Sequence, residues 1–494
     1  MSASLRTADT LIAAPKARVF RTDIQALRAV AIGLVVLNHL WPVRLPGGYV
    51  GVDVFFVISG FLITGHLVGE MRRTGGVRLG AFYARRIRRL LPAALLVLAV
   101  SLVLMVVLLP YPRWERGAWE VAASAGYVEN WFLASMSVNY SALNDAASVV
   151  QHYWSLSVEE QFYIVWPLLL LAALAVARRT GGPTTRREAR ARTTTALVAV
   201  VAVVGVLSFA ASVIYTIVAP PQAYFATFTR GWEFAVGGAI ALFGSRVPLG
   251  RTAADIVSLL GFALIVFAAL VYDHTTAFPG YTALVPVLGT AAVILAGERF
   301  ASLWHAKVTA LRPVQWLGGV SYSLYLWHWP LVVVAPFVIG GEATTLSKLM
   351  VLAIALVLAA LTKRFVEDAG QSWGYWRGSS RRAFGLMITG MIVIAALVAG
   401  VLATYSARVA ADGPPDDLVA STCEGPSALA PGADCADPFG AADYSVMTKK
   451  NEYFYTPGGV RRVPADPHLW GSEDHARVRL LARGRGSDSG LADR

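Results

Sequence analysis

RAVAIGLVVLNH, residues Arg28 to His39, places ten uncharged and mostly apolar residues between a guanidinium and an imidazole. A charged side chain inside a membrane span is costly, so it usually faces the bundle interior and has a function there. Eleven residues turn an α-helix by three full turns plus about 20°, which puts Arg28 and His39 on one face, about 16 Å apart along the axis. Taken singly, Arg28 can equally reach the inner headgroups, and His39 can sit at the outer interface.

The composition of the whole chain indicates a polytopic membrane protein. The 494 residues are 56% hydrophobic and only 15% charged, whereas soluble domains carry about 25% charged residues. We expect no cleavable signal peptide, because the first 21 residues are polar and no small-residue cleavage site follows the first apolar run. The net charge of +12 gathers in short loops between apolar runs, where it orients a membrane protein rather than binding nucleic acid.

Apolar runs long enough to cross a bilayer recur along most of the chain. A span needs about 20 mostly apolar residues, and this length predicts an all-α bundle of eleven transmembrane helices. The predicted spans are 24–41, 49–68, 90–109, 158–177, 195–217, 225–244, 252–271, 281–297, 318–339, 347–363 and 384–404.

One further run, 117–136, is predicted not to cross the membrane. The basic stretches 71–89 (MRRTGGVRLGAFYARRIRR) and 178–192 (RRTGGPTTRREARAR) both belong on the cytoplasmic side. An even number of spans must therefore separate them, and counting 117–136 would make three. We predict a re-entrant or surface-lying helix there.

The same charge pattern predicts the domain organisation. Residues 1–20 form a cytoplasmic segment, 21–370 a membrane domain, 371–404 a linker with an extra transmembrane helix, and 405–494 an extracytoplasmic tail that is mostly irregular. The basic stretch 458–494 is predicted to be disordered.

The only two cysteines, Cys423 and Cys435, lie in this tail. Their spacing suits a small disulfide loop in an oxidising compartment. No further Cys or His cluster accompanies them, so we expect no metal site.

Ionisable residues in several predicted spans fall near the depth of His39. Asp53, four residues inside the second span, is the expected partner: a carboxylate on one imidazole nitrogen raises the basicity of the other, as a general base requires. The alternative is that Asp53 seats a helix cap or a structural ion pair. Glu159 and Glu160 enter the fourth span from the outside, at similar depth.

Two later spans add further polar groups. Arg230 and Glu233 have the i, i+3 spacing that allows pairing on one helical face. His328 lies near the middle of the ninth span. Any one of these groups can be structural, but together they predict a polar cavity that receives a substrate.

At the predicted cytoplasmic face, RRIRRLLP places Arg85, Arg86, Arg88 and Arg89 before the third span, with a proline at a predicted helix start. The arginines are either an ordinary topological anchor or a phosphate site, since guanidinium groups bind phosphates bidentately.

At these residues the sequence resembles the acyltransferase-3 family of membrane-bound O-acyltransferases, over about residues 20–370. The resemblance rests on the Arg28–His39 pair, GGYVGVDVFFVISGFLIT, RRIRRLLP, YWSLSVEEQFY, RGWEF and SYSLYLWHWP, in that order. It implies transfer of an acyl group, usually acetyl, from cytoplasmic acyl-CoA to a hydroxyl of a cell-surface carbohydrate. It also implies that Arg28, His39 and the RRIRRLLP arginines are needed for activity.

The tail departs from the family pattern. Eleven spans with an outside tail look like the bacterial subgroup fused to an SGNH-hydrolase-like domain, which needs well over 90 residues and a Gly-Asp-Ser nucleophile motif. GSDSG at 486–490 has the wrong order. We therefore expect the tail to be a truncated remnant of the linker to that domain.

We accordingly expect a multi-pass O-acyltransferase of the bacterial plasma membrane, with a cytoplasmic N-terminus and no tightly bound cofactor. Acyl-CoA, in the simplest case acetyl-CoA, is the expected donor, held by Arg28 and the four arginines. His39, oriented by Asp53 or by Glu160, is the expected base, and a surface or lipid-linked glycan is the expected acceptor. A polysaccharide or lipid-linked sugar exporter with a proton relay is the rival, although no inverted repeat is visible. An inactive remnant is the third interpretation.

Overall fold

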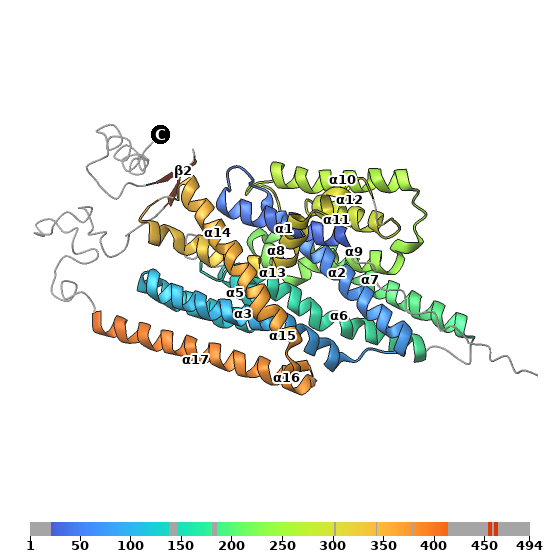
Figure 1. The fold of residues 1–494 in the computed structure, drawn as a ribbon, viewed down its shortest axis with the longest axis horizontal. Coiled ribbons are helices and arrows are strands. Elements are labelled where there is room, and N and C mark those ends of the chain that lie inside the picture. The colour runs from blue at the N-terminus through green and yellow to red at the C-terminus, as the bar shows by residue number, and fades with distance from the viewer. Residues whose placement is uncertain are drawn as a thin grey trace, which may run out of the picture. The chain divides into compact units, whose positions relative to one another are not determined.

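The computed structural model describes residues 21–137, 147–179, 185–300, 303–341, 343–377, 379–412, 453–456 and 459–462. The chain divides into two compact units, Met1–Ala335 with Thr344–Tyr405, and Pro336–Ala343 with Ser406–Arg494. The helices in chain order are α1 (Thr22–Leu40), η1 (Gly48–Val50), α2 (Gly51–Thr74), α3 (Leu79–Leu108), η2 (Tyr111–Arg113), α4 (Trp114–Ala125), α5 (Glu129–Met136), α6 (Tyr153–Arg179), α7 (Arg186–Val218), α8 (Pro220–Phe225), α9 (Thr227–Phe243), η4 (Gly244–Arg246), α10 (Arg251–Val271), α11 (Leu284–Gly297), α12 (Ala306–Thr309), α13 (Arg312–Ile339), α14 (Thr345–Thr362), the π-helix η5 (Lys363–Glu367), α15 (Asp368–Ser372), α16 (Gly374–Arg377) and α17 (Ser380–Asp412) (Figure 1).

The predicted all-α membrane class is confirmed. Within the described residues, nine helices are long and apolar enough to cross a membrane. Two shorter helices, α9 with 17 residues and α11 with 14, occupy the predicted spans 225–244 and 281–297. Each of the eleven apolar runs therefore forms a helix, but only nine reach spanning length.

The stretch 117–136 forms two short helices instead of one long helix. α4 has 12 residues and α5 has 8, and Tyr127 between them has a left-handed backbone with φ 54°. Because each turn of an α-helix rises only about 5.4 Å, neither piece crosses a bilayer. The run therefore does not form one spanning helix, and its predicted re-entrant or surface-lying position stays a prediction.

α3 begins earlier than predicted. The sequence placed RRIRRLLP before a span at 90–109, with its proline at a helix start, whereas α3 runs from Leu79 and contains Pro92 in its interior. The four arginines therefore project from the first turns of a 30-residue helix, and each points around its circumference by 100° per residue. This correction matters for the site, because the arginines belong to a helix whose side chains have fixed directions and not to a loop.

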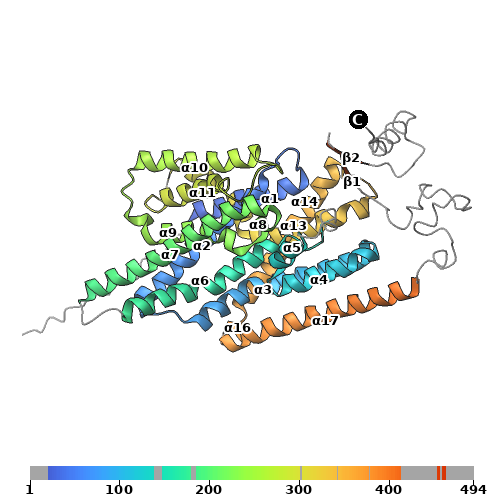
Figure 2. The same cartoon turned by 180° about the vertical axis from the view of Figure 1, so that it is seen from behind.

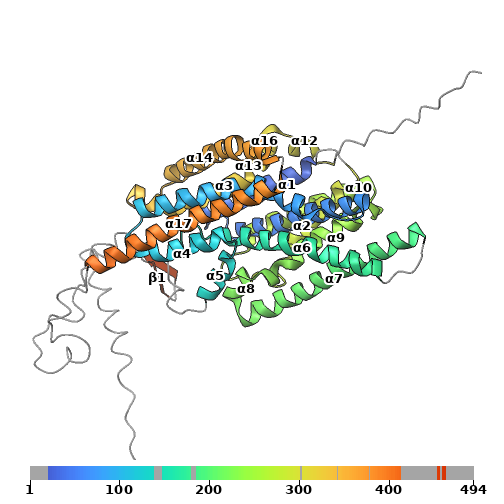
Figure 3. The ribbon, with the colours of Figure 1, turned by 90° about the horizontal axis from the view of Figure 1, so that it is seen from below.

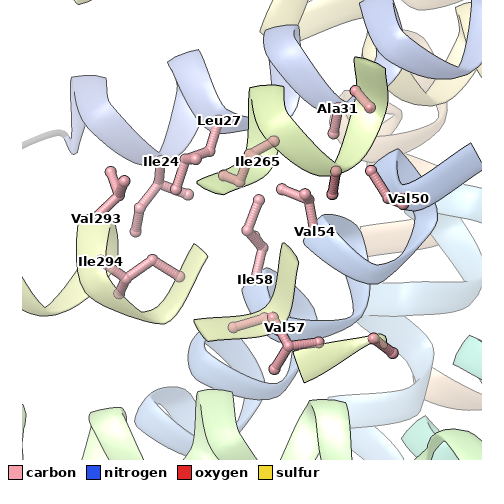
Figure 4. Packing of buried hydrophobic residues seen from close by; sticks show 14 of the residues in the cluster. Ile24, Leu27, Ala31, Val50, Val54, Val57, Ile58, Ile265, Val293 and Ile294 are labelled. Carbon is pink, nitrogen blue, oxygen red and sulfur yellow. The ribbon is translucent and has the colours of Figure 1, made fainter. Parts of the chain in front are cut away.

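Close packing of α1, α2, α10 and α11 forms a hydrophobic core in the larger unit. Figure 4 shows Leu27 and Ala31 of α1 meeting Val54 of α2, Ile265 of α10 and Val293 of α11. All five side chains are fully buried. This packing holds α1 firmly along its apolar face and leaves its polar residues to face other helices.

Glycine allows α2 and α9 to approach each other closely (Figure 2). A Cβ atom on Gly60 would overlap the backbone of Phe234, and one on Gly237 would overlap the backbone of Val57. Small residues at helix crossings let backbones meet in membranes. This contact brings the polar side chains of α2 and α9 together.

The ends of the larger helices follow local sequence signals. A capping box at Thr185 and Glu188 begins α7, as expected from the pattern of a threonine followed three residues later by a glutamate. Gly75, with φ 77°, ends α2. α17 runs beside α3, where Gly390 faces Leu95 (Figure 3).

The smaller unit contains an antiparallel hairpin of β1 (Tyr453–Thr456) and β2 (Gly459–Arg462). β2 lies inside the stretch that was predicted to be disordered, so that prediction is wrong for these four residues. Residues 463–494, Cys423 and Cys435 lie outside the described residues, and the predicted disulfide stays a prediction.

Candidate active site

α1 carries its two basic side chains in different surroundings at the two ends of one face. Arg28 lines a cavity of about 820 Å³. His39 is the penultimate residue of the helix and lies against His328 of α13. A rise of about 1.5 Å per residue separates the two by about 16 Å.

Mixed charges line the cavity at the Arg28 end. Its walls come from α1, α2, α9 and the residues after α11: Arg21, Thr22, Asp23, Ile24, Gln25, Arg28, Phe61, Leu62, Gly65, His66, Ala241, Gly297, Glu298 and Arg299. Arg21 pairs with Asp23 at 2.7 Å and also with Glu298, so its charge is compensated.

Arg28 differs from Arg21 in having no carboxylate in direct contact. Its recorded hydrogen bond goes from Nη1 to Gln25 Oε1 at 3.4 Å, and no ion pair within 4 Å is found for it in the part of the chain that the structure describes. A guanidinium that lines a cavity without a paired carboxylate is suited to bind an anionic ligand.

The four predicted donor-site arginines of α3 do not form one cluster. Arg85 Nη2 contacts His66 Nε2 at 3.0 Å and lies 3.7 Å from the carboxylate of Glu70. Arg88 donates to the carbonyl of Trp376 at 3.1 Å. These two arginines therefore hold neighbouring segments of protein.

Arg86 and Arg89 face the polar interior instead. The Arg86 guanidinium lies 4.1 Å from the ring centroid of Phe82 and 4.5 Å from that of Tyr163. Arg89 interacts electrostatically with Arg28. Arg85 and Arg88 are thus engaged by protein groups, whereas Arg86 and Arg89 lie near the polar groups of α1 and α6. The role of the four arginines in phosphate binding stays a prediction.

Glu159 and Glu160, two adjacent glutamates of α6, have different neighbours. Glu159 accepts hydrogen bonds from Ser59 of α2 and from Tyr163. Glu160 interacts electrostatically with Arg86 and with Arg89. The structure thus places Glu160 in the arginine environment and records no contact between it and His39.

Histidines gather at the other end of α1. His39 Nδ1 lies 3.0 Å from His328 Nε2, with the ring centroids 5.2 Å apart and the ring planes within 10° of parallel. Trp329 meets the His39 ring edge-on at 4.5 Å. His328 is buried, and its Nδ1 lies 2.7 Å from the carbonyl oxygen of Tyr325.

A third histidine, His152, lies just before α6 and was not singled out from the sequence. Its ring centroid is 5.7 Å from that of His328, and its Nε2 lies 3.2 Å from the carbonyl oxygen of Leu326. Pro330 explains this contact, because a proline in a helix supplies no N–H to the carbonyl four residues earlier. The signal in the sequence was the proline itself, which frees a carbonyl that a buried side chain must satisfy.

Burial holds the pKa of the His152 imidazole well below its ordinary value, and the neighbouring histidines His328 and His39 lower it further. The ring is therefore neutral near pH 7. Its Nδ1 is buried without a hydrogen-bond partner among the described residues.

The expected pairing of Asp53 with His39 is wrong. Asp53 Oδ1 instead accepts from Arg230 Nη1 at 2.9 Å, and the same nitrogen lies 2.9 Å from Glu233 Oε1. The predicted Arg230–Glu233 pairing is confirmed. Equal depth does not decide which way a side chain points, and Asp53 points toward α9.

This ion network belongs to the protein interior. Asp53 and Glu233 have no exposed surface, and Arg230 is 1% exposed. The aromatic rings of Trp154, Tyr224 and Phe278 surround the guanidinium at 5.0–5.8 Å. Arg230, Glu233 and His328 do not line the Arg28 cavity. Their predicted place in a substrate cavity stays a prediction.

Fold and site together define a polytopic α-helical membrane protein with an anion-suited cavity at one end of its first helix and a histidine cluster at the other. The family model described as "Acyltransferase domain" matches residues 21–364. The chain therefore belongs to the acyltransferase-3 family, whose members are acyl-transferring enzymes, as the sequence resemblance predicted.

Similar proteins carry names from cell-wall acetylation. The chain is 30% identical to "Putative peptidoglycan O-acetyltransferase YrhL" of Bacillus subtilis over 73% of its own length and 56% of that protein. It is 28% identical to "Peptidoglycan O-acetyltransferase OatA" of Listeria monocytogenes, over 72% of this chain and 57% of the relative. It thus spans less than two thirds of the length of these relatives. No solved structure matches it.

Proposed function

We propose that this chain is a bacterial plasma-membrane O-acetyltransferase that transfers the acetyl group of acetyl-CoA to a hydroxyl of a cell-envelope carbohydrate. The observation that carries the proposal is the division of α1. Arg28 lines a cavity at one end without a paired carboxylate, and His39 meets His328 about 16 Å away on the same helical face. The names of the relatives favour a peptidoglycan-type acceptor.

The donor would bind with its phosphates at the Arg28 cavity. Arg28 has no carboxylate within ion-pair distance among the described residues, although Glu159 and Glu367 interact with it electrostatically. Arg86 and Arg89 add positive charge near Arg28 and Glu160. A long, thin pantetheine arm suits the distance from this cavity to His39. Charge-assisted hydrogen bonds of this kind contribute about 1.5–3 kcal/mol each.

Transfer would occur at the histidine end. An imidazole nitrogen of His39 takes the proton of the acceptor hydroxyl while the oxygen attacks the thioester carbonyl. The carbon–sulfur bond breaks, the acetyl group stays on the acceptor oxygen, and the thiolate of CoA leaves. The imidazolium then returns its proton, so that CoA departs as a thiol.

The orientation of the chain in the membrane is part of the same proposal. The basic loops favour a cytoplasmic N-terminus, so that the Arg28 cavity opens toward the side that holds acyl-CoA and the tail after α17 lies outside. A reporter fused after Gln151 should then read as extracytoplasmic, and a cytoplasmic reading would overturn this arrangement.

The proposal is tested with purified protein, labelled acetyl-CoA and a glycan acceptor, by following CoA release and label transfer. His39→Ala should lower kcat by about 10²–10⁴-fold and keep donor binding, because a general base acts in the transition state. Arg28→Gln should weaken donor binding by about 10- to 100-fold. The exposed residues His274 and Arg312 provide matched controls, His274→Ala and Arg312→Gln.

Equal loss of donor binding in His39→Ala and Arg28→Gln would refute the division of α1. Acetyl-CoA turnover that does not need His39 would refute its role as the general base. Transport of glycan without any label transfer would favour the interpretation of the chain as an exporter.

A further inference from the structure

The hydrogen-bonding partners of His328 determine where its own proton lies. Its Nδ1 faces two backbone carbonyl oxygens of α13, that of Tyr325 at 2.7 Å and that of Leu324 at 3.1 Å. A carbonyl oxygen only accepts hydrogen bonds. Nδ1 of His328 must therefore carry a hydrogen and donate it into its own helix.

Burial keeps His328 neutral. The residue is 1% exposed, and no carboxylate is recorded within hydrogen-bonding distance of it in the described residues. A buried charge without a partner is strongly unfavourable. A neutral imidazole with a hydrogen on Nδ1 has a lone pair on Nε2, so this nitrogen is an acceptor.

The proton on His39 follows from this assignment. His39 Nδ1 lies 3.0 Å from the acceptor Nε2 of His328, and two lone pairs at that distance repel, so His39 Nδ1 supplies the hydrogen. We infer that His328 is a positioning residue that holds His39 in the tautomer with hydrogen on Nδ1 and a free lone pair on Nε2. This inference rests on the proposed function, in which that lone pair takes the proton of the acceptor.

The contacts around His39 and His328 hold both rings in the orientation that this hydrogen bond requires. Pro330 removes an N–H from α13, and His152 donates to the carbonyl of Leu326 that the proline leaves open. The ring of Trp329 packs edge-on against His39, and its Nε1 donates to the carbonyl of Ser148 at 2.8 Å. Both rings of the His39–His328 pair are thus held by neighbours that are themselves hydrogen-bonded.

A direct test is the protonation state of His39 in histidine-¹⁵N-labelled protein in lipid bilayers. Subtracting the spectrum of His39→Gln assigns its two ring nitrogens. The expected result is a protonated Nδ1 and an unprotonated Nε2. A hydrogen on Nε2 of neutral His39 would overturn the inference while leaving the proposed base untouched.

A kinetic test changes the hydrogen-bond acceptor that residue 328 offers to His39. His328→Gln offers a carbonyl oxygen to His39 Nδ1, whereas His328→Leu offers no acceptor. We expect His328→Leu to lower kcat by about 10²–10⁴-fold with an unchanged KM for acetyl-CoA, because a wrong tautomer removes the base only. His328→Gln should restore most of kcat.

Three outcomes separate this inference from the proposed function. Full activity in His328→Leu refutes the acceptor role of His328. A loss of kcat in His328→Gln as large as that in His328→Leu refutes it too. Activity that survives His39→Ala refutes the proposed function itself. If His328→Leu does not fold, as judged by size-exclusion chromatography, the ¹⁵N spectrum of the unchanged protein decides alone.

Discussion

Removing the guanidinium of Arg230 should destabilise the protein rather than disable a substrate site. Arg230 is 1% exposed, and its Nη1 lies 2.9 Å from both Asp53 Oδ1 and Glu233 Oε1, which have no exposed surface. In Arg230→Met these two carboxyl groups lose their shared cation. Breaking a buried ion pair from one side costs about 3–5 kcal/mol, a large share of a total stability of about 5–15 kcal/mol.

The experiment follows unfolding of detergent-purified protein by tryptophan fluorescence and by loss of the monodisperse peak on heating. Arg312→Gln, at an exposed position, is the matched control and should stay within about 0.5 kcal/mol of the unchanged protein. Adding Asp53→Asn and Glu233→Gln to Arg230→Met removes the orphaned charges. This triple variant should recover most of the loss, since uncharged replacement of a buried ion network is often neutral.

The reasoning fails if Arg230→Met unfolds like the unchanged protein and loses only its turnover. Arg230 would then act on a substrate, as the sequence analysis expected. It also fails if the triple variant is no more stable than Arg230→Met, because the penalty would then come from lost packing against the aromatic rings and not from charge.

Three further outcomes are expected. Arg86→Ala should raise the KM for acetyl-CoA, and Arg86→Lys should recover only part of it, because lysine keeps the charge but loses the planar stacking on two rings; an unchanged KM in both would leave Arg86 as a structural residue. Gly60→Val should reduce the yield of monodisperse protein, because its side chain would overlap the backbone of Phe234, whereas Gly33→Ala, with open space around it, should not. The free energy of unfolding should fall as the pH drops below about 6.5, because unfolding lets the buried, neutral His152 bind a proton that the folded protein disfavours. Thermal unfolding between acid and neutral pH measures this dependence, and His152→Phe should make it less steep. An equal pH dependence in His152→Phe and in the unchanged protein would show that His152 contributes nothing to it.

The sequence predicted the helices well because apolar length and charge are local properties. All eleven predicted runs form helices. The break near Tyr127 was not predicted, because the count of spans between two basic loops says only that 117–136 does not cross the membrane. The Arg230–Glu233 pair was predicted for the same reason, since residues three apart on a helix are neighbours.

The partners across helices were not predictable by the same means. His39 and His328 are 289 positions apart, and nothing in a single sequence says which faces of α1 and α13 meet. Asp53 was assigned to His39 because both lie at similar depth, but the close glycine contact between α2 and α9 turns it toward Arg230. The arginines of α3 were interpreted as a loop before a span, whereas they lie within a helix and contact different partners.

The link between Asp53 and Arg230 also has a consequence for biosynthesis. The two residues are separated by 177 positions, so at about 5–20 residues per second the ribosome adds Arg230 roughly 9–35 s after Asp53. During that interval the second span carries, in its first turn, an acid whose cation has not yet been translated, and ionisable groups within a span are unfavourable. The second helix therefore reaches its final place only after α9 has been made, and a ribosome that stalls between the two codons leaves the early helices without the residue that neutralises their buried acid.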